Sequence, residues 1–254
     1  MNIVVLASHQ LRHRYFINHL NTHFPLSAII IEKFLYPPPY SFSKEEQLAW
    51  DWFFQRRKEY ENKNLGTSDY LPAKNTPEVH RIPPGQLNSP GTIDRIKAIN
   101  PDLIVLYGTS RVRSELLKRY PGRIFNLHVG LTEFCRGSSC NFWPIYNECL
   151  EFMGATIHKV DEGIDTGEIL LRESIDLSEE EDEQSLAGKT VILGTALMVK
   201  TIQKWKEGSL TPIPQTEKGK QYFMREFTPK AVLRVKRMVE SGQLQSLARA
   251  RKQG

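Results

Sequence analysis

The sequence is poor in cysteine. Its three cysteines, Cys135, Cys140 and Cys149, lie close together near the middle of a 254-residue chain. An odd number argues against a disulfide framework, and the absence of a CxxC pair argues against a zinc site. We therefore expect reduced, partly buried thiols and no bound metal.

Long hydrophobic runs are absent as well. No segment approaches the roughly 18 consecutive apolar residues that a membrane-spanning helix needs. The first ten residues, MNIVVLASHQ, have neither a basic leader nor a small-residue cleavage site, so they are typical of a strand rather than a signal peptide. These absences predict a cytoplasmic protein that does not bind membranes.

Neither sign of charge dominates the composition. Lys and Arg number 34 against 29 Asp and Glu, which gives a net charge of +5. This balance allows an anionic substrate or a nucleic acid, but it requires neither. Much of the excess lies in residues 230–252, where the ordinary explanation is a solvated helix face or a basic tail.

Short apolar segments alternate with amphipathic ones along most of the chain. Residues 2–7 and 27–32 are typical of buried strands, and the segment between them predicts a helix with Ser8 as its N-cap. Further strands are expected at 102–107, 123–127, 154–160 and 169–175, the last two antiparallel, and helices at 92–99, 114–119, 140–149 and 181–208. The alternation predicts an α/β fold with a mostly parallel sheet.

Residues 36–75 interrupt this alternation. They begin with YPPPYSFS, in which three prolines remove backbone donors and fix φ. A charged, aromatic-rich helix is expected at 44–63, and a short strand, EVHRI, follows the segment. We interpret 36–75 as an insertion that could be a lid, an acceptor-recognition element or an interface, although an aromatic-rich helix more often packs into a core than forms a binding surface.

Two polar stretches are expected to meet beside the sheet. Asn126 and His128 lie at the end of a strand, and the glycine-punctuated loop 161–168 (DEGIDTGE) can bring Asp161 or Asp165 to them. An amide can hold an oxyanion, an imidazole can move a proton, and a carboxylate can orient the imidazole and raise its pKa. The residues alone leave a second interpretation open, in which Asn126 caps a turn and His128 is a buried, hydrogen-bonded histidine.

These residues carry a resemblance to a known family. The segments Asn126-Leu127-His128, Arg136-Gly137, Asp161-Glu-Gly-Ile-Asp165-Thr-Gly167 and PDLIVLYGTSRVRS resemble the folate-dependent formyltransferases, which include glycinamide ribonucleotide, methionyl-tRNA and sugar N-formyltransferases. The resemblance covers roughly residues 95–175. It implies a Rossmann-like, mostly parallel sheet flanked by helices, with a catalytic domain at 1–210 and a short C-terminal segment at 211–254.

The resemblance also implies a reaction, the transfer of a formyl group from 10-formyltetrahydrofolate to an amine without a metal. Asn126 would bond the formyl oxygen as it becomes an oxyanion. His128 would stabilise the tetrahedral intermediate and move its proton, and Asp165 would orient His128. The pterin-like head would bind against Tyr107, Gly108, Thr109, Arg111, Val112, Asp161, Gly163 and Ile164.

The sequence defines the amine acceptor less closely than the formyl donor. The turn after the first strand lacks the glycine-rich phosphate cradle of the glycinamide ribonucleotide enzymes, and the missing GxGxxG argues against a nucleotide-binding oxidoreductase. Side chains could hold an anionic acceptor instead. The candidates are Arg12, His13, Arg14 and Arg136.

The C-terminal segment guides the choice among acceptors. About 45 residues follow the last long helix, too few for the barrel-like domain of methionyl-tRNA formyltransferases, which argues against tRNA. The chain looks most like the sugar N-formyltransferases, which act on nucleotide-linked amino sugars and often dimerise through such segments. Residues that would suit a homodimer interface are Tyr222, Phe223, Met224 and Phe227.

Two alternatives stay open. One is formylation of another small amine, such as glycinamide ribonucleotide or an amino acid. The other is a folate-binding regulatory protein that has kept the fold and lost the activity. The presence of Asn126, His128 and Asp165 together favours an enzyme, because a protein that only binds folate does not need all three.

Overall fold

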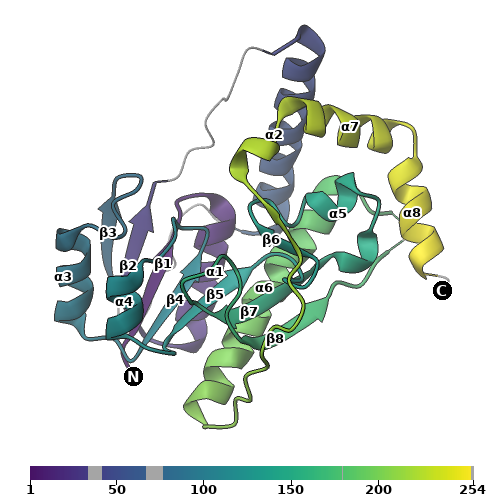
Figure 1. The fold of residues 1–254 in the computed structure, drawn as a ribbon. Helices are drawn as coiled ribbons and strands as arrows, with labels where there is room; N and C mark the ends of the chain where they lie inside the picture. The colour runs from purple at the N-terminus through teal and green to yellow at the C-terminus, as the bar shows by residue number, and fades with distance from the viewer. Residues whose placement is uncertain (34–41, 67–76, 179, 253–254) are drawn as a thin grey trace.

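A seven-stranded sheet forms the centre of the computed structural model, which describes residues 1–33, 42–66, 77–178 and 180–252 (Figure 1). The strand order is β3-β2-β1-β4-β5-β7-β8, parallel from β3 to β5 and antiparallel beyond. The strands are β1 (Ile3–Ala7), β2 (Leu26–Glu32), β3 (Glu78–Ile82), β4 (Leu103–Tyr107), β5 (Ile124–His128), β7 (Gly154–Lys159) and β8 (Ile169–Ser174). The predicted α/β class and the antiparallel pairing of the last two strands are confirmed.

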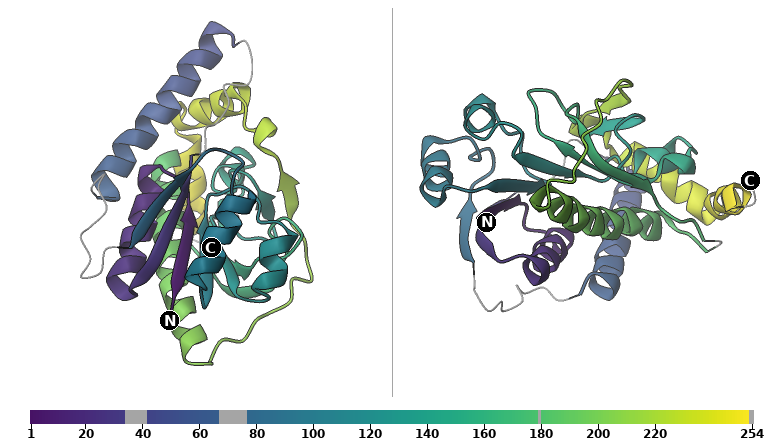
Figure 2. Two further views of the ribbon diagram at one scale, coloured as in Figure 1. Left: turned by 90° about the vertical axis from the view of Figure 1, so that its left-hand side faces the viewer. Right: turned by 90° about the horizontal axis from the view of Figure 1, so that it is seen from below.

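Helices cover both faces of this sheet (Figure 2). One face carries α1 (Leu11–His23) and α6 (Glu183–Lys206), and the other carries α3 (Pro90–Ile99) and α4 (Ser114–Arg119). The chain moves outward from β1 to β3 and then returns to β4 on the other side of β1. The connections that leave β1 and β4 therefore diverge to opposite faces, which is where open α/β sheets bind ligands.

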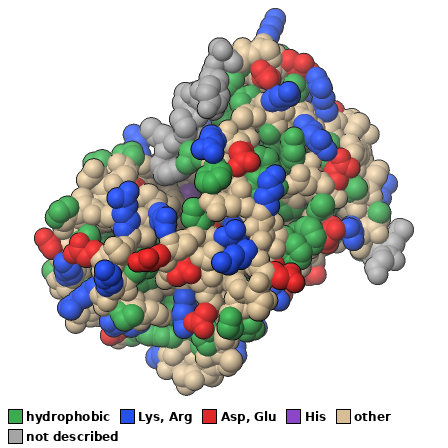
Figure 3. Space-filling view, in the orientation of Figure 1, with side chains coloured by type: hydrophobic (Ala, Val, Ile, Leu, Met, Phe, Trp, Pro, Cys, Tyr) green, Lys and Arg blue, Asp and Glu red, His purple; other side chains and the backbone are tan. Residues whose placement is uncertain are grey.

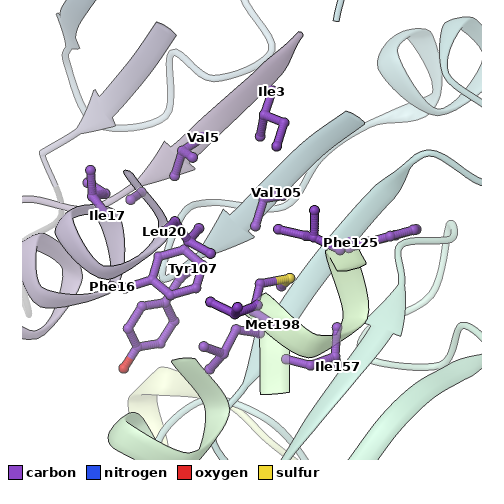
Figure 4. Packing of buried hydrophobic residues seen from close by; sticks show 14 of the residues in the cluster. Ile3, Val5, Phe16, Ile17, Leu20, Val105, Tyr107, Phe125, Ile157 and Met198 are labelled. Atoms are coloured by element: carbon purple, nitrogen blue, oxygen red, sulfur yellow. The ribbon is translucent and has the colours of Figure 1, made fainter. Parts of the chain in front are cut away.

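The central strands are apolar on both faces, because helices bury both. In β1, Ile3, Val5 and Ala7 belong to the core under α1 and α6, whereas Val4 and Leu6 belong to the core under α3 and α4. Figure 4 shows side chains of β1 and β4 meeting those of α1 and α6. A strand buried in this way has a continuous apolar run, here IVVLA, rather than an alternating pattern.

The apolar character of α6 also reflects burial. This helix has the length and composition of a membrane-spanning segment, but 61% of its most apolar window is buried inside the fold. It packs against α1 and β7 and contributes Val191, Leu197, Met198 and Ile202 to the core. Asp182 caps its first turn by accepting from the backbone N–H groups of Gln184 and Ser185.

A second, aromatic core joins the predicted insertion to the C-terminal segment. It lies between α2 (Lys44–Asn64), α5 (Trp143–Tyr146), α7 (Pro229–Glu240) and α8 (Gln243–Lys252) (Figure 1). The Phe53 side chain is 2% exposed, with its ring centroid 5.8 Å from that of Phe142 and 5.7 Å from that of Phe227. The helix expected at 44–63 is confirmed, while most of the rest of the 36–75 insertion lies outside the described residues.

Two local predictions were wrong. Ser8 does not cap α1, because it is buried at the end of β1 and the helix begins at Leu11, after Gln10. The helix expected at 140–149 is confined to α5, and a 3-10 turn at Leu150–Phe152 follows it. Glu148 has a φ of 62°, a left-handed conformation that cannot continue a helix.

The residues suggested for a homodimer interface are largely used inside the chain. Phe227 is 2% exposed within the aromatic core, and the Tyr222 ring stacks on Trp143 with centroids 4.4 Å apart. Tyr222 also ends β9 (Lys220–Tyr222), which pairs with β6 (Cys135–Gly137) in a small second sheet that was not predicted. Tyr222 and Phe227 therefore cannot serve as the contact surface between two copies.

The basic C-terminal segment forms ion pairs within the chain. Its paired side chains are Arg234 with Glu148, Lys236 with Glu240, Arg237 with Glu45, and Arg251 with Glu151. Charges of both signs are interspersed over the face shown in Figure 3. Each exposed pair contributes only about 0–1 kcal/mol to stability. Part of the excess positive charge is nevertheless paired with nearby carboxylates and is not concentrated in one positive patch.

We expect Phe53→Ala to lower the free energy of unfolding by about 3–5 kcal/mol, because it leaves a cavity in the aromatic core. Leu48→Ala on the same helix is the matched control. The Leu48 side chain is 58% exposed, so its loss should change stability by less than about 0.5 kcal/mol. Urea unfolding of both variants measures the difference. Equal losses would contradict the packing of α2 described above.

Candidate active site

A cavity of about 520 Å³ lies where the connections after β1 and β4 diverge. Its wall includes the turn after β1, the residues after β4, the end of β5, residues 137–141 and the loop after β7. Cavities of this size bind small molecules, and this is the usual ligand position in an open parallel sheet.

The structure brings Asn126, His128 and Asp165 together at this cavity. Asn126 and His128 are two apart on β5, so their side chains lie on one face of the sheet. The loop after β7 begins beside the start of β5, where the Val160 N–H donates to the Ile124 carbonyl at 2.8 Å. It then folds back, so that Asp165 Oδ2 lies 3.3 Å from His128 Nδ1 and Oδ1 lies 3.4 Å from Asn126 Nδ2.

His128 lies between two hydrogen-bond acceptors. Its Nε2 is 2.9 Å from the Cys135 carbonyl oxygen, and its Nδ1 faces the Asp165 carboxylate. The ring satisfies both acceptors only when both nitrogens carry a proton. Burial alone would lower the pKa of His128, but the charge and hydrogen bond of Asp165, together with the Cys135 carbonyl, outweigh burial and raise that pKa. The charged imidazolium is therefore favoured.

Asp165 is a buried carboxylate with several partners. Burial would raise the pKa of Asp165, but its interactions with His128 and His158 hold that pKa well below the ordinary value. The Gly137 N–H also donates to Oδ2 at 2.7 Å. The backbone of Asp165 has a φ of 51°, a left-handed conformation that aspartate tolerates better than most residues. The loop thus holds a charged carboxylate against the histidine.

His158 is a further member of the site that was not predicted from the sequence. It lies opposite Asn126 in the β5–β7 pairing, and its Nε2 is 3.1 Å from Asn126 Nδ2 and 3.2 Å from Asp165 Oδ1. Its Nδ1 lies 2.7 Å from the Lys159 carbonyl oxygen, which leaves Nε2 facing both Asn126 and Asp165. A histidine in the apolar strand before the acidic loop is the signal that could have identified it.

The residues predicted for donor binding all line the cavity. They are Tyr107, Gly108, Thr109, Arg111 and Val112 after β4, and Asp161, Gly163 and Ile164 in the loop after β7. Asp161 shapes this loop by accepting from the Gly163 N–H at 3.0 Å and from Thr166 Oγ1 at 2.8 Å. Gly108 has a φ of 71°, and a Cβ there would lie 2.2 Å from His13 Nε2, so a side chain does not fit.

Two residues that were not predicted hold the segment after β4 in place. Glu32, fully buried at the end of β2, accepts from the Ser110 N–H at 2.7 Å and from the Gly85 N–H at 2.8 Å. The Asn88 side chain accepts from the Arg113 N–H and donates to the Arg111 carbonyl. The sequence feature that could have identified Glu32 is a carboxylate at the end of an otherwise apolar strand.

Of the four candidates for acceptor binding, Arg12 and His13 line the cavity, whereas Arg14 and Arg136 are not among its lining residues. Arg12 Nη1 lies 2.7 Å from Glu61 Oε1. Burial lowers the pKa of His13 well below the ordinary value, which favours a neutral ring beside Tyr107. The Arg136 guanidinium donates to backbone carbonyls of Gly219 and Ile164, so it supports the loops around the site.

Helix α2 forms another wall of the cavity, through Arg57, Tyr60 and Glu61. Its position against α6 is set partly by Arg56, whose guanidinium lies 2.6 Å from Glu183 Oε1 and 2.7 Å from Asp182 Oδ2.

Close packing fixes the same contact, because a Cβ on Gly188 of α6 would lie 2.0 Å from the Tyr60 ring. These contacts hold the α2 wall of the cavity in place.

The expectation of reduced thiols was wrong for two of the three cysteines. Cys135 and Cys140 form a disulfide, with Cα atoms 5.6 Å apart, and Cys149 remains a thiol. The chain reverses between the bonded cysteines because Gly137 and Ser139 both have positive φ, at 90° and 60°. Among the described residues, no group of three or more His, Cys, Asp and Glu side chains is arranged to hold a metal ion.

Comparisons with known proteins point to one family. Residues 54–202 match the family model described as formyl transferase. The methionyl-tRNA formyltransferase of Thermodesulfovibrio yellowstonii is 33% identical over 135 residues, which are 52% of this chain and 43% of that protein. That of Citrifermentans bemidjiense is 33% identical over 150 residues, 58% of this chain and 47% of that protein. The chain thus spans about half the length of the curated relatives that it matches.

Solved structures share the fold at lower identity. A likely sugar N-formyltransferase from Mycobacterium tuberculosis has a TM-score of 0.59 at 15% identity, covering 89% of this chain and 77% of that one. The phosphoribosylglycinamide formyltransferase of Anaplasma phagocytophilum has a TM-score of 0.58 at 14% identity, covering 88% and 98%. The formyltransferase PseJ of Anoxybacillus kamchatkensis, solved with a UDP-linked formamido sugar and tetrahydrofolate, has a TM-score of 0.53 at 17% identity, covering 89% and 87%.

We expect Asp165→Asn to lower the pKa of His128, because the carboxylate that offsets burial is lost. In the wild-type protein the raised pKa of His128 adds stability that is complete below about pH 6.5, the pKa of an unfolded histidine, and is lost as pH rises through the higher folded pKa. The variant should therefore lose more stability at about pH 6 than at about pH 9. Imidazole NMR titration and urea unfolding at both pH values measure these effects.

Asp161→Asn is the matched control in the same loop, because the Asp161 carboxylate contacts Gly163 and Thr166 rather than a histidine. It should leave the pKa of His128 unchanged. A His128 pKa that is equal in the wild type and in Asp165→Asn would contradict the described pairing.

Proposed function

Because the chain belongs to the formyl transferase family, we propose that it transfers a formyl group from 10-formyltetrahydrofolate to a primary amine of a small acceptor. The observation that carries this proposal is the convergence of Asn126, His128 and Asp165 on one cavity, beside a segment suited to a pterin ring. An amide, an imidazolium and a carboxylate are the groups that acyl transfer to an amine requires.

The reaction begins when the amine nitrogen attacks the formyl carbon. The formyl oxygen then carries a developing negative charge, which the Asn126 N–H group and the His128 cation can stabilise. The amine proton must reach the folate nitrogen before the bond between that nitrogen and the formyl carbon breaks. His128 can relay this proton, and Asp165 keeps the ring oriented and charged.

The donor would bind between the segment after β4 and the loop after β7. Residues Tyr107 to Val112 line the cavity together with Asp161, Gly163 and Ile164. Main-chain donors and acceptors would suit the polar edge of a pterin, and the Glu32 contacts keep the segment after β4 preorganised.

For the acceptor, we propose an anionic amine, with a nucleotide-linked amino sugar as the leading class. Arg57 supplies positive charge to the cavity wall formed by α2, Arg12 adds a guanidinium that is paired with Glu61 of the same wall, and Tyr60 supplies an aromatic face. The likeness to PseJ, solved with a UDP-linked sugar, supports this class. Another small amine, such as glycinamide ribonucleotide or an amino acid, is the second candidate, since a phosphoribosylglycinamide enzyme shares the fold.

The test of the reaction separates donor binding from chemistry. We expect 5-formyltetrahydrofolate to bind saturably in a calorimetric titration, and amino-sugar nucleotides to be formylated first in a panel of amines. Asn126→Ala should keep donor binding and lower kcat by about 10²–10³-fold, as loss of an oxyanion donor does elsewhere. Donor binding with no transfer to any amine would favour the folate-binding alternative, and the absence of donor binding would reject both.

The proposed acceptor wall has a test of its own. Arg57→Met keeps the length of the side chain and removes its charge, so KM for an anionic acceptor should rise about tenfold or more with little change in kcat. Lys58→Met is the matched control, because Lys58 is the next residue of α2 and is exposed outside the cavity lining. Equal KM values in both variants would remove Arg57 from acceptor binding.

A further inference from the structure

A disulfide closes the segment that contacts both His128 and Asp165. Cys135 and Cys140 bracket residues 136–139, and their side chains are 4% and 1% exposed. We call residues 135–140 the bridged segment. Its residues 137–140 also line the cavity, so the disulfide lies directly beside the catalytic groups.

The bridged segment holds the catalytic pair through its main chain. The Cys135 carbonyl accepts from His128 Nε2 at 2.9 Å, and the Gly137 N–H donates to Asp165 Oδ2 at 2.7 Å. Neither contact depends on a side chain of the segment, so the backbone path between the two cysteines decides both. A cross-link across that path therefore acts on the geometry of His128 and Asp165.

The contact with Cys135 leaves His128 without a ring nitrogen for the substrate. Nδ1 faces Asp165 and Nε2 faces the Cys135 carbonyl. A histidine that is oriented by a carboxylate normally uses its other nitrogen to exchange protons with the reacting groups. In the bridged form that nitrogen is bound to a backbone oxygen, so proton transfer requires the Cys135 peptide to turn away.

The disulfide restrains the peptide that must turn. Cys135 lies at the start of β6, where the ladder with β9 holds it on one side. The bond to Cys140 holds it on the other, across a turn in which Ser139 has the left-handed φ of 60°. Reduction would leave the Gly137 contact in place and remove the restraint on the Cys140 side, so that the first residue of the β6–β9 ladder can open and let the Cys135 carbonyl turn from His128.

We propose that Cys135 and Cys140 are positioning residues that form a redox switch, in which the disulfide holds His128 in a resting contact and its reduction frees Nε2 for formyl transfer. This inference rests on the proposed function. The reductant is a dithiol. One of its thiolates attacks a sulfur of the bridge, the S–S bond breaks, and the second thiol resolves the mixed disulfide. Two protein thiols form, and the dithiol becomes a disulfide.

The cavity offers the route for this exchange. Both sulfur-bearing side chains are almost fully shielded from solvent, and Cys140 is the one of the two that lines the cavity. The exchange would take place from inside the site, so a bound formyl-folate should slow it. In a reducing cytosol such a bond is transient, which is the usual character of disulfides that sense redox state there.

The experiment compares the full chain after oxidation with diamide and after reduction with dithiothreitol. Thiol counting should find one alkylatable thiol in the oxidised form, Cys149, and three in the reduced form. With an amine that supports turnover, reduction should raise kcat by about 10²-fold with little change in KM, as gain of a proton-transfer group does.

A second readout does not need turnover. The Cys135 carbonyl contributes to the raised pKa of His128, so imidazole NMR should find a lower His128 pKa in the reduced protein than in the oxidised one. A role confined to overall stability would not move this value. If neither form transfers formyl groups, the proposed function fails, whereas the NMR difference still decides the switch.

Variants complete the test. Cys135→Ser with Cys140→Ser should show the kcat and the His128 pKa of the reduced form and should not respond to oxidant. Cys135→Ala with Cys140→Ala is the second version, for use if buried hydroxyl groups impair folding. Cys149→Ser is the matched control and should keep the full response. Three thiols after oxidation, or equal His128 pKa values in the two forms, would overturn the proposal.

Discussion

The buried carboxylate of Asp165 is the group on which the site depends. Removing an ion from water is expensive, and the cost is offset only when charges and hydrogen bonds surround it. Here the partners come from three parts of the chain: Asn126 and His128 on β5, His158 on β7 and the Gly137 N–H on the small second sheet. None of these elements could shift alone without leaving the carboxylate short of a partner. One charge therefore couples the strands and loops that build the site.

The change from parallel to antiparallel pairing makes this arrangement possible. Because β7 runs antiparallel to β5, His158 lies directly opposite Asn126 and shares its face of the sheet. The following loop starts beside the beginning of β5 and has to fold back across that face, which carries Asp165 to His128. The topology thus supplies the second histidine and the carboxylate together.

Much of the fold was predictable because its signals are local. The apolar run of β1 and the Asn126-Leu127-His128 and Asp161–Gly167 motifs are contiguous, so their structure follows from a few neighbouring residues. The failures have a different origin. The disulfide requires positive φ at Gly137 and Ser139, which spacing between cysteines does not reveal. The burial of Tyr222 and Phe227 depends on α2, Phe142 and Trp143, all distant in sequence. The sequence predicted the strand that contains His158, but it did not show which residues His158 contacts.

The same distinction separates two parts of the cavity wall. The residues after β4 and in the loop after β7 lie within segments that the motifs mark. The wall that includes Arg12 and α2 is built by long-range contacts: Arg12 with Glu61, and Arg56 of α2 with the first turn of α6, 126 and 127 residues away. Substitutions in α2 can reshape this wall while leaving Asn126, His128 and Asp165 in place. The motifs could therefore be recognised in the sequence, whereas the shape of this wall depends on how α2 packs against α6 and α7 in this chain.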